Sequence, residues 1–160
     1  MIFGIGVDVL QMQRMHASYV RFGAHLVQRL LLEQEQAQFA RVSRPERFLA
    51  LRFAAKEAIV KAMGTGFAHG IWIRDVGVVQ NRWGKPEIIY SERGERVRRR
   101  LGIGEGHVTL TDEAGLIVAV AVLLRATGRK RRASVPAAAE RLSGARAGGP
   151  RRAAKRGLRK

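Results

Sequence analysis

Two carboxylates and one lysine are the residues whose types and spacing could do chemistry in this chain. Asp8 interrupts an apolar segment, residues 2–10, although aspartate is a poor strand former. Glu57 and Lys61 lie four residues apart in a segment with helical spacing, so they share one face, one turn apart. Two carboxylates suit a Mg²⁺ ion whose coordination shell is completed by waters and phosphate oxygens. A lysine can act as a point charge on the phosphate. These residues are therefore a candidate Mg²⁺–phosphate site.

The same residues also have simpler structural interpretations. Glu57 and Lys61 could form an ordinary helix pair worth roughly 0.3 kcal/mol, and the helix alone favours that interpretation. Asp8 could be a structural partner of an arginine or a lysine, because a buried carboxylate needs one. Spacing along the chain does not decide between these pairs and a metal site.

Arg52 and Lys56 fall among apolar neighbours of the same helix. A charge in a packed interior is costly unless it is paired or binds a ligand. We expect these two side chains to help complete a site with a neighbouring subunit.

A glycine-rich turn, Gly64-Thr65-Gly66, follows that helix. Its backbone N–H groups could approach a phosphate closely. It is not a Walker loop, since no Gly-Lys-Ser/Thr follows. Taken alone, this pattern is more often a simple turn.

The elements that must position these residues mix helices and strands without regular alternation, which predicts an α+β fold with a long central helix on antiparallel strands. Apolar and β-branched runs bounded by turn residues predict strands, and helical spacing with Pro45 at the start and Gly64 at the end predicts the long helix. We expect strands at 2–10, 71–80, 86–91, 107–112 and 116–124 and helices at 11–22, 31–41, 45–64 and 92–101.

Charge is distributed unevenly over the 160 residues. From Arg125 onward there are thirteen Lys or Arg against Glu140 alone, a net +12, which leaves +5 of the total +17 for residues 1–124. We expect a folded domain at 1–125 and a basic, disordered tail at 126–160. The chain has no cysteine, which excludes disulfides and thiolate sites and fits a cytoplasmic location, and we expect neither a membrane span nor a signal peptide.

Four segments in order resemble the holo-acyl-carrier-protein synthases, compact bacterial members of the 4′-phosphopantetheinyl transferase family. The first is Gly4-Ile5-Gly6-Val7-Asp8-Val9 with Arg14, and the second runs from Arg52-Phe53-Ala54-Ala55-Lys56-Glu57-Ala58 to Lys61-Ala62-Met63-Gly64-Thr65-Gly66. Gly84-Lys85-Pro86 and His107-Val108-Thr109-Leu110-Thr111-Asp112 fit the later family segments. The resemblance covers residues 1 to about 124.

The resemblance implies the fold of that family, Mg²⁺ on Asp8 and Glu57, and Lys61 at the phosphates. It also implies that Gly64 and Thr65, with Arg52 and His107 as further contacts, bind the coenzyme A nucleotide. An acidic acyl carrier protein would meet Arg14 and Arg21, with help from His16 or Arg29. The family is typically a homotrimer with sites between protomers, so Arg52 and Glu57 would serve different sites.

The implied reaction is phosphoryl transfer in fatty acid biosynthesis. A carrier-protein serine attacks the β-phosphate of coenzyme A, and adenosine 3′,5′-bisphosphate leaves. The serine proton passes to water at the metal or to Glu57, and both remain open. Two positions depart from the family pattern: Gln11 replaces a common glutamate, and Asp112 replaces a histidine found in many relatives.

Two alternatives come from other classes of protein. A nucleic-acid-binding module would explain the basic tail but not Asp8 or the Lys-Glu-Ala-x-x-Lys helix. A structural oligomer would use Asp8 and Glu57 only in ion pairs. Metal-dependent release of the bisphosphate, with and without the tail, separates all three.

Overall fold

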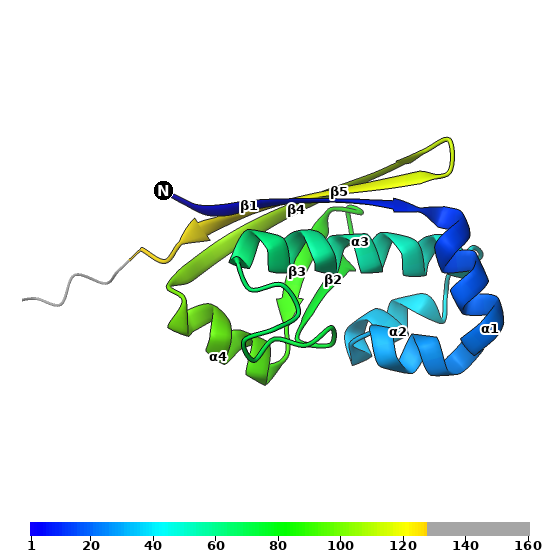
Figure 1. Cartoon of the computed structure of the whole chain (residues 1–160), viewed down its shortest axis with the longest axis horizontal. Helices are drawn as coiled ribbons and strands as arrows, with labels where there is room; N and C mark the ends of the chain where they lie inside the picture. Colours follow the sequence, from blue (N-terminus) through cyan, green and yellow to red (C-terminus); the bar gives the residue numbers. More distant parts are fainter. Residues whose placement is uncertain (128–160) are drawn as a thin grey trace, which may run out of the picture. The chain divides into compact units, whose positions relative to one another are not determined.

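The structure is a computed structural model that describes residues 1–127. Its central helix α3 (Pro45–Met63) is packed on two sides (Figure 1). One side contacts a sheet of β1 (Ile2–Gln11), β5 (Leu116–Arg125) and β4 (Ile103–Glu113), in that order. The chain also forms α1 (Met12–Leu30), α2 (Glu33–Phe39) and the β2–β3 hairpin (Val76–Gln80 and Pro86–Tyr90), followed by α4 (Glu92–Arg100). The predicted α+β fold, with a long central helix on antiparallel strands, is confirmed.

Small side chains let the sheet and α3 approach each other. On β5 the inward positions are Ile117, Ala119, Ala121 and Leu123, and all four are buried. Strand β1 comes closest, because a Cβ on Gly6 would lie 2.0 Å from the carbonyl oxygen of Ala58. A Cβ on Gly4 would lie 2.1 Å from the carbonyl oxygen of Ala62. These two glycines therefore set how β1 crosses the helix.

The outer face of β1 and β5 in the same sheet is apolar and at least partly exposed. Side chains of β1 that point away from α3 are about half exposed, from 49% for Val7 to 59% for Ile5. The antiparallel register continues this face across β5: Val7 pairs with Val120, and Val9 with Val118. An apolar face of this kind on a folded protein marks an interaction surface.

Several predicted boundaries were wrong in informative ways. The first helix does not stop at residue 22: it kinks at Gly23, where φ is +47°, and continues to Leu30. The strand predicted at 71–80 begins only at Val76, because the preceding residues form a turn in which Asp75 accepts a hydrogen bond from the Trp72 amide, 2.7 Å. The predicted helix 31–41 is limited to Glu33–Phe39, and β4 begins earlier, at Ile103.

The predicted hairpin across Glu113-Ala114-Gly115 is present, with positive φ at Ala114 and Gly115. The prediction of a disordered basic tail at 126–160 lies, except for residues 126 and 127, outside the described residues. Within residues 1–127, no helix is both long and apolar enough to cross a membrane.

Candidate functional site

Asp8 lies where β1 crosses α3. Side chains alternate along the strand, so Asp8 is on the inner face with Gly4 and Gly6. The close passage of the two glycines over α3 brings the Asp8 carboxylate beside the C-terminal half of that helix. Its side chain is 13% exposed, so it is shielded but not sealed from solvent.

Lys61 contacts Asp8 rather than its neighbour on the helix. Its Nζ donates to Asp8 Oδ1 at 2.8 Å and to the carbonyl oxygen of Val7 at 3.2 Å. The sequence left open an ion pair between Asp8 and a lysine, and this pair is formed. The Lys61 side chain nevertheless remains 48% exposed. An exposed amine beside a carboxylate remains accessible to a phosphate.

Glu57 interacts electrostatically with both Asp8 and Lys61. Partial burial raises the pKa of the Glu57 carboxyl, the nearby charge of Asp8 raises it further, and Lys61 acts in the opposite direction. The two carboxylates are therefore close enough to repel each other. This pair fits a divalent cation, because a cation between two carboxylates removes the repulsion.

The donor set suits Mg²⁺ more than a metal that needs many protein ligands. Within residues 1–127 no group of three or more His, Cys, Asp or Glu side chains is arranged to hold a metal ion. Mg²⁺ commonly takes one or two carboxylates and completes its shell with water and substrate phosphate oxygens. Asp8 and Glu57 are the residues that would hold it.

The Gly-Thr-Gly sequence at the end of α3 forms a capping turn, the more common of the two interpretations of this pattern. Gly64 caps the helix in the left-handed conformation, with φ +73°. The amide of Gly64 donates to Lys61, and those of Thr65 and Gly66 donate to Val60. What this turn offers a ligand is the Thr65 hydroxyl, which is buried and has no hydrogen-bond partner within the described residues. Such an orphaned hydroxyl is a cost that a bound ligand can remove.

Arg52 and Lys56 lie on another side of α3, away from Asp8. Lys56 is fully buried and bonds Glu35 Oε2 at 2.7 Å and the carbonyl oxygens of Val76 and Ile73. The expectation that Lys56 helps complete a neighbouring subunit's site is wrong, since its bonds are made within its own chain. Arg52 is 2% exposed and contacts α2.

His107 is on the outer face of the sheet, opposite the face that carries Asp8. It pairs with Val122 of β5, which in turn pairs with Ile5 of β1. One protomer therefore does not bring His107 to the two carboxylates.

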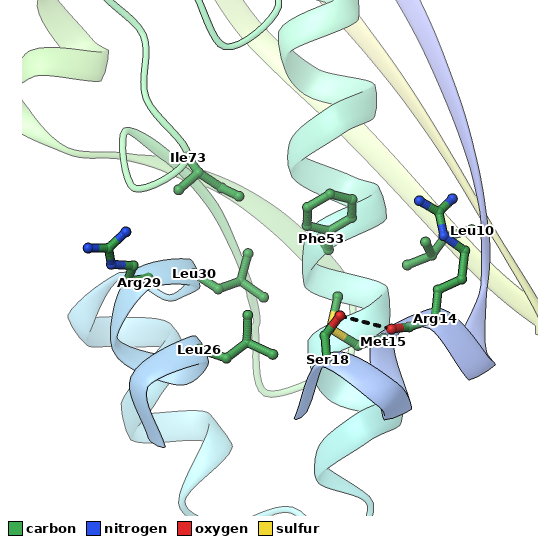
Figure 2. Close-up of a pocket in the computed structure, with 9 residues that line it drawn as sticks. All are labelled: Leu10, Arg14, Met15, Ser18, Leu26, Arg29, Leu30, Phe53 and Ile73. Carbon is green, nitrogen blue, oxygen red and sulfur yellow. Dashed lines mark hydrogen bonds between the residues drawn. The ribbon is translucent and has the colours of Figure 1, made fainter. Parts of the chain in front are cut away.

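Arg14 lines an apolar pocket of about 260 Å³ between α1, β1 and α3. Figure 2 shows Leu10 and Phe53 on one side of this pocket and Leu26, Leu30 and Ile73 on the other. Leu10 follows Asp8 by two residues on the same strand face, and Phe53 precedes Glu57 by one helical turn. The pocket thus continues from the carboxylate pair, with Arg14 beside it and Arg29 at the far end.

Arg21 lies on α1 before the kink and is exposed, with its guanidinium 5.0 Å from the centre of the Phe22 ring. Arg14 is also exposed. The two arginines are therefore available to an acidic partner.

Sequence reasoning missed Glu35 and the second half of α1. Glu35 is an acid in a polar segment, and nothing local shows that it is buried. Leu26, Val27 and Leu30 have helical spacing, which could have extended the first helix past Gly23.

The chain is similar to known proteins over nearly all of its described part. A model of the 4′-phosphopantetheinyl transferase superfamily matches residues 4–120. The holo-[acyl-carrier-protein] synthase of Cronobacter sakazakii is 38% identical over 122 residues, which cover 76% of this chain and 97% of the relative. That of Vibrio parahaemolyticus is 36% identical with the same coverage.

Solved structures give the same result. The holo-[acyl-carrier-protein] synthase of Neisseria meningitidis superposes with a TM-score of 0.74 at 33% identity, covering 78% of this chain and 100% of that chain. The enzyme of Bacillus anthracis, solved in complex with CoA (3′,5′-ADP), has a TM-score of 0.64 at 31% identity, covering 79% of this chain and 99% of that one.

Proposed function

The chain belongs to the holo-acyl-carrier-protein synthases of the 4′-phosphopantetheinyl transferase superfamily, and we propose that it transfers 4′-phosphopantetheine from coenzyme A to a serine of an acyl carrier protein. In this reaction the serine oxygen forms a bond to the β-phosphorus. The bond from that phosphorus to the bridging pyrophosphate oxygen breaks, and adenosine 3′,5′-bisphosphate leaves. The observation that carries the proposal is the cluster of Asp8, Glu57 and Lys61 beside α3.

Mg²⁺ held by Asp8 and Glu57 would neutralise charge on the pyrophosphate oxygens. Lys61 already contacts Asp8, and its exposed ammonium can turn to the leaving phosphate and offset the charge that develops there. Glu57 or a water molecule beside it would accept the serine proton. Most of the rate enhancement would come from positioning and electrostatics.

Thr65 supports the binding of coenzyme A next to this site. Its unpartnered hydroxyl is one residue beyond the cap of the helix that carries Glu57 and Lys61. The Bacillus anthracis relative was solved with CoA (3′,5′-ADP). We assign Gly64, Thr65 and Lys61 to one protomer's share of the site, and Arg52 and His107 to the share of a neighbour.

The exposed apolar face of β1 and β5 supports a homotrimer. It offers a continuous apolar surface to further copies of this chain, and closed cyclic assemblies bury such patches. His107 of β4 lies on the same outer side of the sheet, beside Val122 of β5, so assembly would bring it to another protomer. Light scattering should give about three times the monomer mass, and Val7→Lys should lower it. An active monomer at the assay concentration would contradict the trimer.

The pocket beside Arg14 supports docking of the carrier protein. An apolar side chain of the carrier can enter the hollow between Leu10, Phe53 and Leu26 while Arg14 and Arg21 meet its acidic groups (Figure 2). The pocket lies next to the carboxylate pair, so a serine close to that apolar side chain would reach the phosphate. A role in fatty acid biosynthesis and a cytoplasmic location remain predictions, as does any nucleic-acid contact through residues 126–160.

The deciding experiment is mass analysis of an apo acyl carrier protein incubated with coenzyme A, Mg²⁺ and this chain. We expect the carrier to gain one phosphopantetheine mass and to release one equivalent of bisphosphate. Excess chelator should stop both. A carrier whose mass stays unchanged with the folded chain would refute the proposed function.

A further inference from the structure

A second charged cluster, buried between α2, α3 and β2, is not used by the proposed chemistry. Its hub is Glu35, which is fully buried. The carboxylate accepts from Lys56 Nζ at 2.7 Å and from the amides of Leu32 at 2.8 Å and Val78 at 2.9 Å. Gly77 makes this approach possible, because a Cβ there would lie 2.9 Å from Glu35 Cδ.

Arg52 leaves this cluster with an excess of positive charge. Lys56 already balances Glu35 at short range, whereas the Nε of Arg52 is 4.0 Å from Glu35 Oε1 and is buried without a hydrogen-bond partner in the described part of the chain. Burial lowers the pKa of Arg52 to about 10, and the more distant Glu35 only partly opposes this. A buried cation that its own chain does not fully compensate is suited to an anionic ligand.

The Arg52 side chain lines a surface hollow of about 270 Å³. Its guanidinium stacks over the Phe48 ring, 4.1 Å from the ring centre. Arg41 and Arg44 also line the hollow and are exposed. Arg47 lines it as well but is paired with Asp112. A hollow lined by four arginines, one of them paired, is the type of surface that recognises phosphate.

Gln38 fixes one end of the Arg52 guanidinium. The amide of Gln38 is held by Gln80 at the end of β2: Nε2 donates to the Gln80 carbonyl at 2.8 Å, and Oε1 accepts from the Gln80 amide at 3.1 Å. The same Oε1 accepts from Arg52 Nη2 at 3.2 Å. The oxygen that orients the guanidinium therefore cannot rotate away without loss of two backbone bonds.

We propose that Gln38 is a positioning residue, which holds the Arg52 guanidinium in the arginine-lined hollow so that it binds a phosphate group of coenzyme A. This inference rests on the proposed function, because it needs coenzyme A as the ligand. Gln38 does not touch the ligand and acts only through Arg52. Its neutral oxygen orients the guanidinium without neutralising it, so the charge remains for the phosphate.

The test is calorimetric binding of adenosine 3′,5′-bisphosphate to Gln38→Ala, Arg52→Met and the double variant. We expect Gln38→Ala to weaken binding about three- to tenfold, the range of one typical intramolecular hydrogen bond. The double variant should bind no more weakly than Arg52→Met. In steady-state assays Gln38→Ala should raise KM for coenzyme A by the same factor and leave kcat nearly unchanged.

Gln36→Ala is the matched control. Gln36 lies on the same helix, and its amide also bonds a backbone carbonyl, that of Leu31 at 3.1 Å, but it has no hydrogen bond to Arg52. It should alter stability without altering affinity. Gln38→Asn, which keeps a shorter amide, is the second variant if Gln38→Ala does not fold.

The outcomes separate this inference from the proposed function. Wild-type affinity in Gln38→Ala, or a double variant that is weaker than Arg52→Met by the full Gln38→Ala factor, overturns the positioning role. Wild-type affinity in Arg52→Met also overturns it, while phosphopantetheine transfer by that variant leaves the proposed function intact. If the unaltered chain neither binds the bisphosphate nor transfers, the proposed function itself fails.

Discussion

Two charged clusters lie on different sides of α3, and they differ in how completely their charges are satisfied. In one, Glu35 and Lys56 are fully buried and each makes three hydrogen bonds within the chain. In the other, Asp8 and Glu57 repel each other and Lys61 is half exposed. The saturated Glu35–Lys56 pair stabilises the fold, whereas the unsaturated cluster, like Arg52 beside that pair, remains available to a ligand.

Removing a carboxylate from the unsaturated cluster should have the largest effect. We expect Asp8→Ala and Glu57→Ala each to reduce transfer about a thousandfold or more, since a metal ion provides several kcal/mol of charge stabilisation. Circular dichroism should show that the fold persists. Full activity in either variant, or of the wild type in excess chelator, would show that these carboxylates are not metal ligands.

Removing the hub of the saturated cluster should affect stability. Glu35→Ala leaves Lys56 buried without its counter-charge, which should lower the free energy of unfolding by about 3–5 kcal/mol. Urea denaturation measures this loss of unfolding free energy. Glu33→Ala, an exposed acid on the same helix, is the control and should stay within about 0.5 kcal/mol of wild type. Equal losses in the two variants would contradict the contrast between the clusters.

Lys61→Met keeps the aliphatic stem and removes the charge. We expect kcat to fall about ten- to a hundredfold, with a smaller change in coenzyme A affinity, because the charge matters most as the leaving group departs. Single-turnover rates together with equilibrium binding measure the two effects. An unchanged kcat would make Lys61 only a structural partner of Asp8.

Charge reversal on α1 should have the smallest effect. Arg14→Glu or Arg21→Glu should raise KM for the carrier severalfold and leave KM for coenzyme A unchanged, and salt should weaken the wild-type interaction by screening. Deletion of residues 126–160 is the control. If the deletion removes the salt effect and the reversals do nothing, the tail recruits the carrier.

Local patterns were enough for most of the fold. The predicted bounds of the long helix, 45–64, differ from α3 by one residue, because Pro45 and Gly64 act within their own turns. Asp8 was identified because a carboxylate contradicts its apolar strand. Its contact with Lys61, 53 residues away, was one of several pairings left open.

Long-range contacts were not predictable in the same way. Glu35 is an ordinary acid in its own sequence, and only Lys56, 21 residues later, shows why it is buried. The strand at 71–80 was placed five residues too early because Asp75 is held by Ser91 and Arg93, which belong to another element. The Gly-Thr-Gly pattern allowed either a phosphate contact through its amides or a simple turn, and in the structure these amides complete the cap of α3.

The close passage of β1 over α3 also determines which substitutions by uncharged residues the enzyme can tolerate. Gly6→Ala adds one methyl group far smaller than any charged side chain, yet that methyl would meet the Ala58 carbonyl oxygen at 2.0 Å. The strand would have to lift from the helix and take Asp8 with it. The spacing between the two proposed metal-binding carboxylates therefore depends on the absence of a side chain at Gly4 and Gly6. We expect a larger residue at either position to inactivate the site, although the chain would retain every charged residue.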